Sequence, residues 1–194
     1  MAFDGDNLIK LEFEKLVKQY KIQTIIETGT YLGETTVEFT KMVPNVWTIE
    51  SSTENLEKAQ EKLSNYVNVL CILGHSEQVL PELLQNKSIV RPLMFYLDAH
   101  WEDYNPLRDE LVVISSSAKD SVIAIHDFKV PNHPELGFDY YPILENGIKK
   151  GYYPLCFELI QDILQYCYTK GYRYYYNDKA DCENKRGIIY ICPL

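Results

Sequence analysis

The stretch TIIETGTYLGETT, residues 24–36, decides the fold of this chain. It opens with a short apolar, β-branched run, passes Glu27 and Gly29, and from Gly33 continues with residues that suit a helix. This order predicts a strand, a tight turn and a helix. Because glycine has no Cβ, a ligand can approach the backbone of such a turn, and the following helix begins with unpaired N–H groups. The stretch therefore indicates a ligand-binding turn, although many α/β proteins use the same turn for packing alone.

A second acidic residue extends this interpretation. Glu50 ends the next apolar run, NVWTIE. An acid at that position of a βαβ unit typically accepts hydrogen bonds from the hydroxyls of a ribose. Together, the glycine turn and Glu50 favour a site for a nucleoside cofactor.

Strand-like and helix-like segments alternate through the first two-thirds of the chain. We expect strands over Thr24–Glu27, Val46–Glu50, Val67–Leu73, Leu93–Leu97 and Val122–Ile125. We expect a first helix from the N-cap Asp6 to Tyr20, a second over Gly33–Met42 and a third from the capping residue Thr53 to Leu63. A short helix follows Gly74-His75-Ser76-Glu77 and runs to Leu84, and another covers Leu107–Ser117. The last helix starts at Pro154 and is ended by Gly171. This alternation predicts a parallel sheet with right-handed crossovers. Val67–Leu73 is nearly continuously apolar, which is typical of buried parallel strands.

The last third of the chain departs from this alternation. Tyr172–Tyr176 and Ile188–Cys192 are separated by a polar loop and predict an antiparallel hairpin. Before them, Lys129–Tyr153 shows no clean period and carries several aromatic residues. A long connection without regular structure is usually functional, so we expect a lid over the ligand-binding face. The alternative is a surface loop packed by its own aromatic side chains.

Bulk composition limits the classes of function. The chain has 194 residues, which suits one domain (1–194, with an N-terminal helix within 1–20) rather than two. Its net charge of −9 argues against nucleic acid as a partner. We see no signal peptide and no apolar run of membrane-spanning length, so we expect a cytoplasmic protein without a membrane partner. The five cysteines form no CxxC pair and are expected to be reduced. The oligomeric state stays open, a homodimer included.

Polar residues follow each expected parallel strand. Ligands of open α/β sheets bind outside the carboxyl ends of the strands. The residues at those ends are Glu27, Glu50, His75, Asp98 and Asp127. This clustering is the strongest argument from the residues themselves for a site at that edge of the sheet.

Asp98, His100, His126 and Asp127 follow two neighbouring strands of the expected sheet. Two carboxylates with an imidazole can bind a hard divalent cation such as Mg²⁺, with Asp98, His126 and Asp127 as its ligands. Alternatively, Asp98 is a polar contact to cofactor or substrate without any metal. Asp98, His100 and His126 are the candidate catalytic residues, and either histidine suits a general base because imidazole titrates near neutrality. A histidine beside a strand end is also often only hydrogen-bonded into the fold.

In these motifs and in the order of its elements, the chain resembles the class I S-adenosylmethionine-dependent methyltransferases over about residues 20–194. The resemblance implies an α/β, Rossmann-like, doubly wound fold. Its sheet would be seven-stranded and mostly parallel, with a C-terminal antiparallel hairpin and helices on both faces. ETGTYLGETT looks like the first motif of small-molecule O-methyltransferases. There Gly29 and Gly33 would flank the methionine end of the cofactor, and Glu27 would face its amino group.

The family's later motifs imply further contacts to S-adenosylmethionine. Glu50 would bind the ribose hydroxyls, and His75-Ser76 stands where the family often has an acid and a small residue near the adenine. The cofactor-binding residues that the resemblance implies are Glu27, Thr28, Gly29, Thr30, Gly33, Glu50, Ser51, His75, Ser76 and Asp98.

LDAHWED, residues 97–103, is similar to a stretch of catechol O-methyltransferase, and the acids after the two strands also resemble macrolide-sugar O-methyltransferases. In those families the acids hold Mg²⁺, which binds a substrate diol, lowers the hydroxyl pKa and orients the oxygen toward the methyl sulfonium. We therefore expect O-methylation of a small hydroxylated molecule (a phenol, a sugar or a natural product), with or without Mg²⁺. Glu102 stands where the catechol enzyme has its lysine base, so a metal-independent methyltransferase and a non-catalytic cofactor-binding module stay open.

Overall fold

The computed structural model describes residues 1–100, 104–145 and 148–194, so Trp101, Glu102 and Asp103 of the LDAHWED stretch lie outside the described residues. The helices are η1 (Ala2–Gly5, a 3₁₀ turn), α1 (Asn7–Tyr20), α2 (Glu34–Met42), α3 (Thr53–Leu63), α4 (Ser76–Leu83), α5 (Leu107–Ser117) and α6 (Phe157–Cys167). The strands are β1 (Thr24–Thr28), β2 (Asn45–Glu50), β3 (Val69–Leu73), β4 (Leu93–Leu97), β5 (Val122–Ile125), β6 (Tyr140–Glu145), β7 (Ile148–Pro154), β8 (Tyr172–Tyr176) and β9 (Ile189–Pro193). None of the described helices is both long and apolar enough to cross a membrane.

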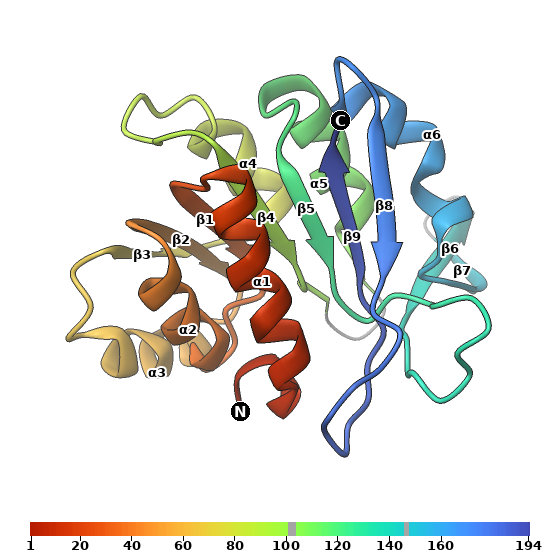
Figure 1. Cartoon of the computed structure of the whole chain (residues 1–194), viewed down its shortest axis with the longest axis horizontal. Coiled ribbons are helices and arrows are strands. Elements are labelled where there is room, and N and C mark those ends of the chain that lie inside the picture. Colours follow the sequence, from red (N-terminus) through yellow and green to blue (C-terminus); the bar gives the residue numbers. More distant parts are fainter. Residues whose placement is uncertain (101–103, 146–147) are drawn as a thin grey trace.

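Within the described residues, seven strands form one sheet in the order β3-β2-β1-β4-β5-β9-β8 (Figure 1). Strands β1 to β5 pair in parallel, and β9 pairs antiparallel with both β5 and β8. The expected mostly parallel sheet with a C-terminal antiparallel hairpin is therefore confirmed. The strand order reverses between β1 and β4, and open α/β sheets bind ligands at such a reversal.

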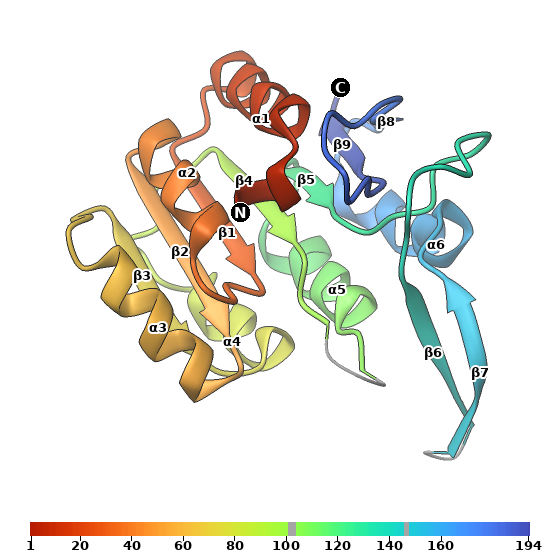
Figure 2. The same ribbon diagram turned by 90° about the horizontal axis from the view of Figure 1, so that it is seen from below.

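Helices cover both faces of the sheet (Figures 1 and 2). On one face, Phe13 of α1 packs against Phe39 of α2 and Tyr96 of β4, with ring centroids 5.2 and 5.4 Å away. On the other face, α4, α5 and α6 contribute a second cluster that includes Leu80 and Leu111. Because β1 and β4 lie between these layers, all their residues are buried. The loops that follow these two strands therefore start from a rigid base.

The prediction of a buried strand over Val67–Leu73 is wrong. Strand β3 begins only at Val69, and Leu70 and Leu73 are 48% and 50% exposed. The physical reason is the position of β3 at the edge of the sheet, where it has a neighbouring strand on one side only. An apolar run reports burial on both faces only for a central strand.

Three helix starts also differ from the prediction, while the N-cap Asp6 of α1 is confirmed. Helix α2 begins at Glu34, and Gly33 is its N-cap. Helix α3 is capped by Ser52 rather than Thr53, because the Ser52 hydroxyl accepts a backbone N–H of the first turn at 3.3 Å. Helix α6 begins at Phe157, since Pro154 is the last residue of β7.

The segment Lys129–Tyr153 contains regular structure, contrary to the expectation. Strands β6 and β7 pair antiparallel and form a two-stranded hairpin that projects from the body of the molecule (Figure 2). The register shifts between Ile143 and Leu144. A shift of this kind breaks the alternation of side chains between the two faces, which explains why the sequence shows no clean period.

Gly187, just before β9, packs directly against the chain that follows β5. Its N–H donates to the Gly137 carbonyl at 2.8 Å, and its carbonyl accepts the Phe128 N–H at 2.8 Å. A Cβ at Gly187 would overlap the Phe128 carbonyl oxygen. We predict that Gly187→Ala lowers the free energy of unfolding by about 2 kcal/mol or more, because only a backbone shift relieves the overlap. Urea unfolding followed by circular dichroism measures this change.

Gly151→Ala is the matched control, because a Cβ at Gly151 would meet no atom within 4 Å. This variant should change the free energy of unfolding by less than about 0.5 kcal/mol. Equal losses in the two variants would contradict the packing of Gly187.

Candidate functional site

The carboxyl ends of the parallel strands surround a cavity of about 480 Å³. Its size lies within the range of roughly 300–1,000 Å³ that is usual for small-molecule sites. Five of the predicted cofactor-binding residues line it: Gly29, Glu50, Ser51, Ser76 and Asp98. The other three predicted residues of the chemical site, His100, His126 and Asp127, line the same cavity. Of the five residues predicted at the carboxyl ends of the strands, Glu50, Asp98 and Asp127 line this cavity, while Glu27 and His75 do not.

The glycine turn after β1 packs against the loop that follows β4. Gly29 has a φ of +85°, and a Cβ there would lie 2.6 Å from the Asp98 carbonyl oxygen. The Gly29 N–H donates to the Ile49 carbonyl at 2.9 Å. Gly29 is thus required by close contact with the chain itself, while its exposed side lines the cavity.

Glu50 is held rigidly at the cavity wall. One carboxylate oxygen accepts the Tyr31 N–H and the other accepts the Ser52 N–H, both at 2.8 Å. Each carboxylate oxygen has a second lone pair, so Glu50 retains the capacity to accept hydrogen bonds from a ligand. The side chain is oriented before any ligand arrives.

The other predicted cofactor residues are not part of the cavity lining; these are Glu27, Thr28, Thr30, Gly33 and His75. Glu27 is only 1% exposed and accepts hydrogen bonds from the hydroxyls of Thr36 and Thr48, at 2.6 and 2.7 Å. Burial raises the pKa of Glu27 to about 8, although these two hydrogen bonds lower it. In this geometry Glu27 supports the turn from beneath the cavity, and its contact with a cofactor amino group stays a prediction.

Glu110 on α5 is a buried acid that the sequence analysis did not single out. It is 1% exposed, and burial raises its pKa to about 7, while the hydroxyls of Ser76 and Thr28 lower it. The available signal was its position within the apolar stripe of α5, beside Leu107 and Leu111.

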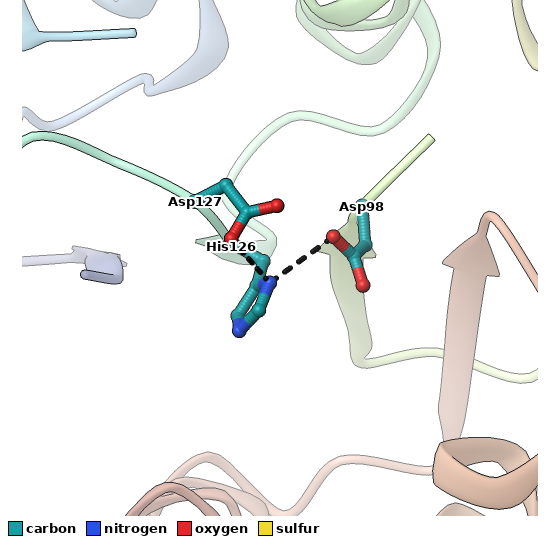
Figure 3. Close-up of side chains that lie close together, drawn as sticks. All are labelled: Asp98, His126 and Asp127. Carbon is teal, nitrogen blue, oxygen red and sulfur yellow. Dashed lines mark hydrogen bonds and ion pairs between the residues drawn. The ribbon is translucent and has the colours of Figure 1, made fainter. Parts of the chain in front are cut away.

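His126 lies between the two carboxylates that follow β4 and β5. Its Nδ1 is 3.2 Å from Asp98 Oδ1 and 3.2 Å from Asp127 Oδ1 (Figure 3). Burial disfavours the charged ring, but the charges of Asp98 and Asp127 outweigh it and raise the pKa of His126 well above its usual value. The His126 side chain is only 4% exposed, whereas that of His100 is 44% exposed, so a ligand can reach His100 more readily and the geometry favours His100 over His126 as the general base.

Asp127 and Asp139 form a closed ring of contacts with Arg186 and His100. The Arg186 guanidinium contacts Asp127 Oδ1 through Nε and Asp139 Oδ1 through Nη2. On the other side, His100 Nε2 lies 3.4 Å from Asp127 Oδ2 and 3.4 Å from Asp139 Oδ2. Burial raises the pKa of the Asp127 carboxyl, but the charge of His126 and the hydrogen bonds of its partners hold it well below its usual range. The hydrogen bond to Asp127 raises the pKa of His100.

Asp139 and Arg186 are members of the site that sequence reasoning missed. Asp139 lies in the connection between β5 and β6, and Arg186 lies in the polar loop between β8 and β9. Neither residue follows a parallel strand, so the rule that ligands bind at the carboxyl ends of the strands does not find them. No periodicity or motif in the sequence indicated either one.

A second cavity, of about 310 Å³, adjoins this ring. It is lined by His100 and Asp139 together with three tyrosines, Tyr104, Tyr140 and Tyr152. Tyr140 of β6 and Tyr152 of β7 stand edge-to-face, with ring centroids 6.4 Å apart. His100 therefore lines both cavities, and the projecting hairpin contributes aromatic walls to the second one.

Two sets of described residues have the spacing of metal ligands, Asp98–His126–Asp127 and His100–Asp127–Asp139. Their donor atoms are already engaged within the chain. His126 Nδ1 contacts both Asp98 and Asp127, and Arg186 contacts Asp127 and Asp139. A divalent cation would have to displace the guanidinium from Asp127 and a proton from His126. As arranged here, these residues do not fit the expected Mg²⁺ site.

No protein-family model and no curated protein matches the sequence. Solved structures do match. One is the O-methyltransferase TomG from Streptomyces achromogenes, which is involved in tomaymycin synthesis and was solved with S-adenosylmethionine. Its TM-score is 0.62 at 15% identity, and the match covers 94% of this chain and 78% of that chain. An O-methyltransferase from Bacillus cereus, solved with S-adenosylhomocysteine, has a TM-score of 0.61 at 15% identity, covering 95% and 80%.

The fold is that of the class I methyltransferases. An rRNA methylase from Streptococcus thermophilus also shares it, with a TM-score of 0.56 at 11% identity, covering 93% of this chain and 92% of that one. At these identities the likeness concerns the fold alone. Because the same fold serves enzymes named for different substrates, the substrate class has to be argued from the site.

The buried acid Glu27 predicts a pH dependence of stability. Its pKa is about 8 in the folded chain, against an ordinary value of 4.5. Between pH 4.5 and about pH 8 the folded state holds a proton on Glu27 that the unfolded state has lost. The contribution of Glu27 to the free energy of unfolding therefore falls as the pH rises through this window. Glu27→Gln keeps an oxygen for the Thr36 and Thr48 hydroxyls and cannot ionise. We predict that its stability falls less steeply with pH than that of the wild type, measured by urea unfolding at a series of pH values.

Glu57→Gln, at an exposed position of α3, is the control and should leave the slope unchanged. If the free energy of unfolding fell equally steeply with pH in the wild type and in Glu27→Gln, burial would not raise the pKa of Glu27.

Proposed function

We propose that this protein transfers a methyl group from S-adenosylmethionine to a hydroxyl oxygen of a small molecule. The observation that carries the proposal is the position of His100, which lines both the cavity at the strand ends and the aromatic cavity beside it. The first cavity suits the cofactor and the second suits a ring-bearing substrate, with an imidazole where the two meet. The S-adenosylmethionine and S-adenosylhomocysteine named for similar structures support the first assignment.

Glu50 is the proposed ribose contact, because its two oxygens are already oriented by backbone N–H groups at the cavity wall. Gly29 and Asp98 line the part assigned to the methionine end, and Ser76 lines the part assigned to the adenine. When bound, the cofactor supplies a methyl group on a positively charged sulfur. The acids that line the cavity, Asp98 and Asp127 among them, favour a cation at that place.

His100 is the proposed general base. Its Nε2 is held at 3.4 Å from both Asp127 and Asp139, which leaves Nδ1 to accept the proton of the substrate hydroxyl. A carboxylate that holds an imidazole in this way also stabilises the imidazolium that forms. Tyr140 and Tyr152 would contact the ring or sugar face of the substrate.

The net charge of −9 and the acidic cavity support a small-molecule substrate over a nucleic acid. A metal-assisted form of the same reaction would use Asp98, His126 and Asp127 as ligands. The contacts of these residues with one another and with Arg186 favour the metal-independent form.

The assignment of Glu50 predicts the behaviour of cofactor binding. Glu50→Ala removes the acceptors for the ribose hydroxyls, and hydrogen bonds to a charged group contribute about 1.5–3 kcal/mol, so we expect S-adenosylhomocysteine to bind roughly 10- to 100-fold more weakly. Calorimetric titration in the presence of EDTA measures the dissociation constant. Glu54→Ala, which removes an exposed acid of α3 that pairs with Lys58, is the control and should bind as the wild type does. Unchanged affinity in Glu50→Ala would refute this cofactor pose.

The assignment of His100 predicts a loss of turnover without a loss of cofactor. His100→Gln is expected to lower methyl transfer to hydroxylated acceptors by about 10²-fold or more, because a positioned general base contributes that much. Its affinity for S-adenosylhomocysteine should stay within about threefold of the wild type. His133→Gln, which removes a histidine paired with Glu135 outside both cavities, is the control. A screen of phenols and sugars with radiolabelled S-adenosylmethionine supplies the assay, and undiminished turnover in His100→Gln would exclude this role.

A further inference from the structure

A fixed side-chain cation contacts Asp127, one of the three predicted Mg²⁺ ligands. We propose that Arg186 takes the place of a divalent cation beside Asp127, so that the site holds its carboxylates without a metal. The inference rests on the proposed function, because it concerns how that site orients its acids and His100. It adds Arg186 and Asp139 to the site as positioning residues.

The contacts of Arg186 are those of a bridging cation. Its guanidinium joins Asp127 and Asp139, one oxygen of each, through two different nitrogens. The opposite oxygens of the same two carboxylates face His100 Nε2. A planar guanidinium presents donors in a fixed fork, which suits two carboxylates better than a point charge does. Arg186 therefore sets the separation of the acids between which His100 lies.

The backbone around Arg186 is fixed on both sides. The Lys185 carbonyl accepts the Gly137 N–H at 2.8 Å, and Gly187 donates to Gly137 and accepts from Phe128, each at 2.8 Å. Gly137 and Arg186 also pair as a β-bridge. Main-chain hydrogen bonds on both sides thus fix the backbone from which the Arg186 side chain, 21% exposed, extends.

Asp139 is fixed to Asp127 in the same manner. The Asp139 N–H donates to the Asp127 carbonyl at 2.8 Å, and the Asp139 carbonyl accepts the Leu155 N–H at 2.9 Å. The two acids lie at the two ends of the β5–β6 connection and Arg186 lies in the β8–β9 loop, and the backbones of these two loops are hydrogen-bonded to each other. The acid pair is built to receive a cation, and the chain itself supplies that cation.

Electrostatics explain why a cation is required at this point. The Asp127 side chain is only 8% exposed, and the Asp139 carboxylate shares its two partners. A buried carboxylate without a partner is strongly unfavourable, and two carboxylates at one place repel each other. Either a divalent cation or a fixed arginine supplies the positive charge that these two carboxylates require. The guanidinium contacts one oxygen of Asp127 and one of Asp139, and His100 lies at the other oxygen of each, so all four oxygens already have a partner within the chain.

The test measures metal binding directly and needs no substrate. Mn²⁺ is titrated into the wild type and followed by the electron paramagnetic resonance of the free ion, with and without S-adenosylhomocysteine. The wild type is expected to leave millimolar Mn²⁺ free. Arg186→Gln removes the cation and leaves both acids, so we expect it to bind one Mn²⁺ per chain, at least about tenfold more tightly than the wild type. Arg173→Gln, which removes an exposed arginine that bonds to Tyr20, is the matched control and should behave as the wild type does.

Tight stoichiometric binding of Mn²⁺ to the wild type would overturn the inference, and so would an Arg186→Gln variant that folds but gains no affinity. If Arg186→Gln does not fold, NMR of the wild type decides. The Arg186 Nε–H resonance, assigned by its loss in Arg186→Lys, should not move in millimolar Mg²⁺, and a shift would contradict the proposal. Binding of S-adenosylhomocysteine in the same samples reports on the proposed function separately, so the two ideas can fail independently.

Discussion

The buried Asp127 carboxylate is the group on which the organisation of the site depends. It follows β5 directly, at the edge of the sheet where the parallel strands end. It is contacted by His126 on its own loop, by Arg186 from the loop before β9, and by His100 from the loop after β4. A carboxylate at this depth is tolerated only with such partners. Its need for positive charge therefore connects loops that are far apart in the sequence.

The sheet makes this arrangement possible because its centre is rigid. Strands β1 and β4 are buried on both faces by two separate layers of helices, so the residues that follow them have little freedom. The contact between Gly29 and the Asp98 carbonyl sets the distance between the two loops at the reversal of strand order. A cavity at that point has a fixed floor, while its outer walls come from less regular segments.

The acidic side chains in and around the cavity differ in burial and hydrogen bonding, and therefore in their roles. Glu50 lies at the cavity wall with both oxygens held by N–H groups, which suits it to accept hydrogen bonds from a ligand. Glu27 and Glu110 are each only 1% exposed and do not line the cavity, and burial raises their pKa values to about 8 and about 7. Near neutral pH Glu27 therefore holds a proton more firmly than an ordinary acid does, and it supports the site through its hydrogen bonds with Thr36 and Thr48 rather than through a fixed negative charge. Asp127, paired with cations, keeps its charge.

The sequence by itself determined the sheet and the strand-end residues. Alternating apolar runs predicted β1, β2, β4 and β5 to within a residue or two, and the residues that follow them, from Glu27 to Asp127, lie at one edge of the sheet. This succeeds because period and strand polarity are local properties, and the carboxyl ends of parallel strands share an edge by geometry.

Only the tertiary structure decided which of these residues line the cavity and which support it. Glu27 is buried beneath the turn because Thr36 and Thr48 enclose it, and β3 is half exposed because no strand covers its outer side. The pairing of Arg186 with Asp127 and Asp139 joins positions 47 and 59 residues apart, and no local pattern encodes such a contact. The sequence thus specified which strand ends carry the residues of the site. Long-range packing determined that Arg186 is the cation beside Asp127, because charge pairing depends on where separate loops meet in space.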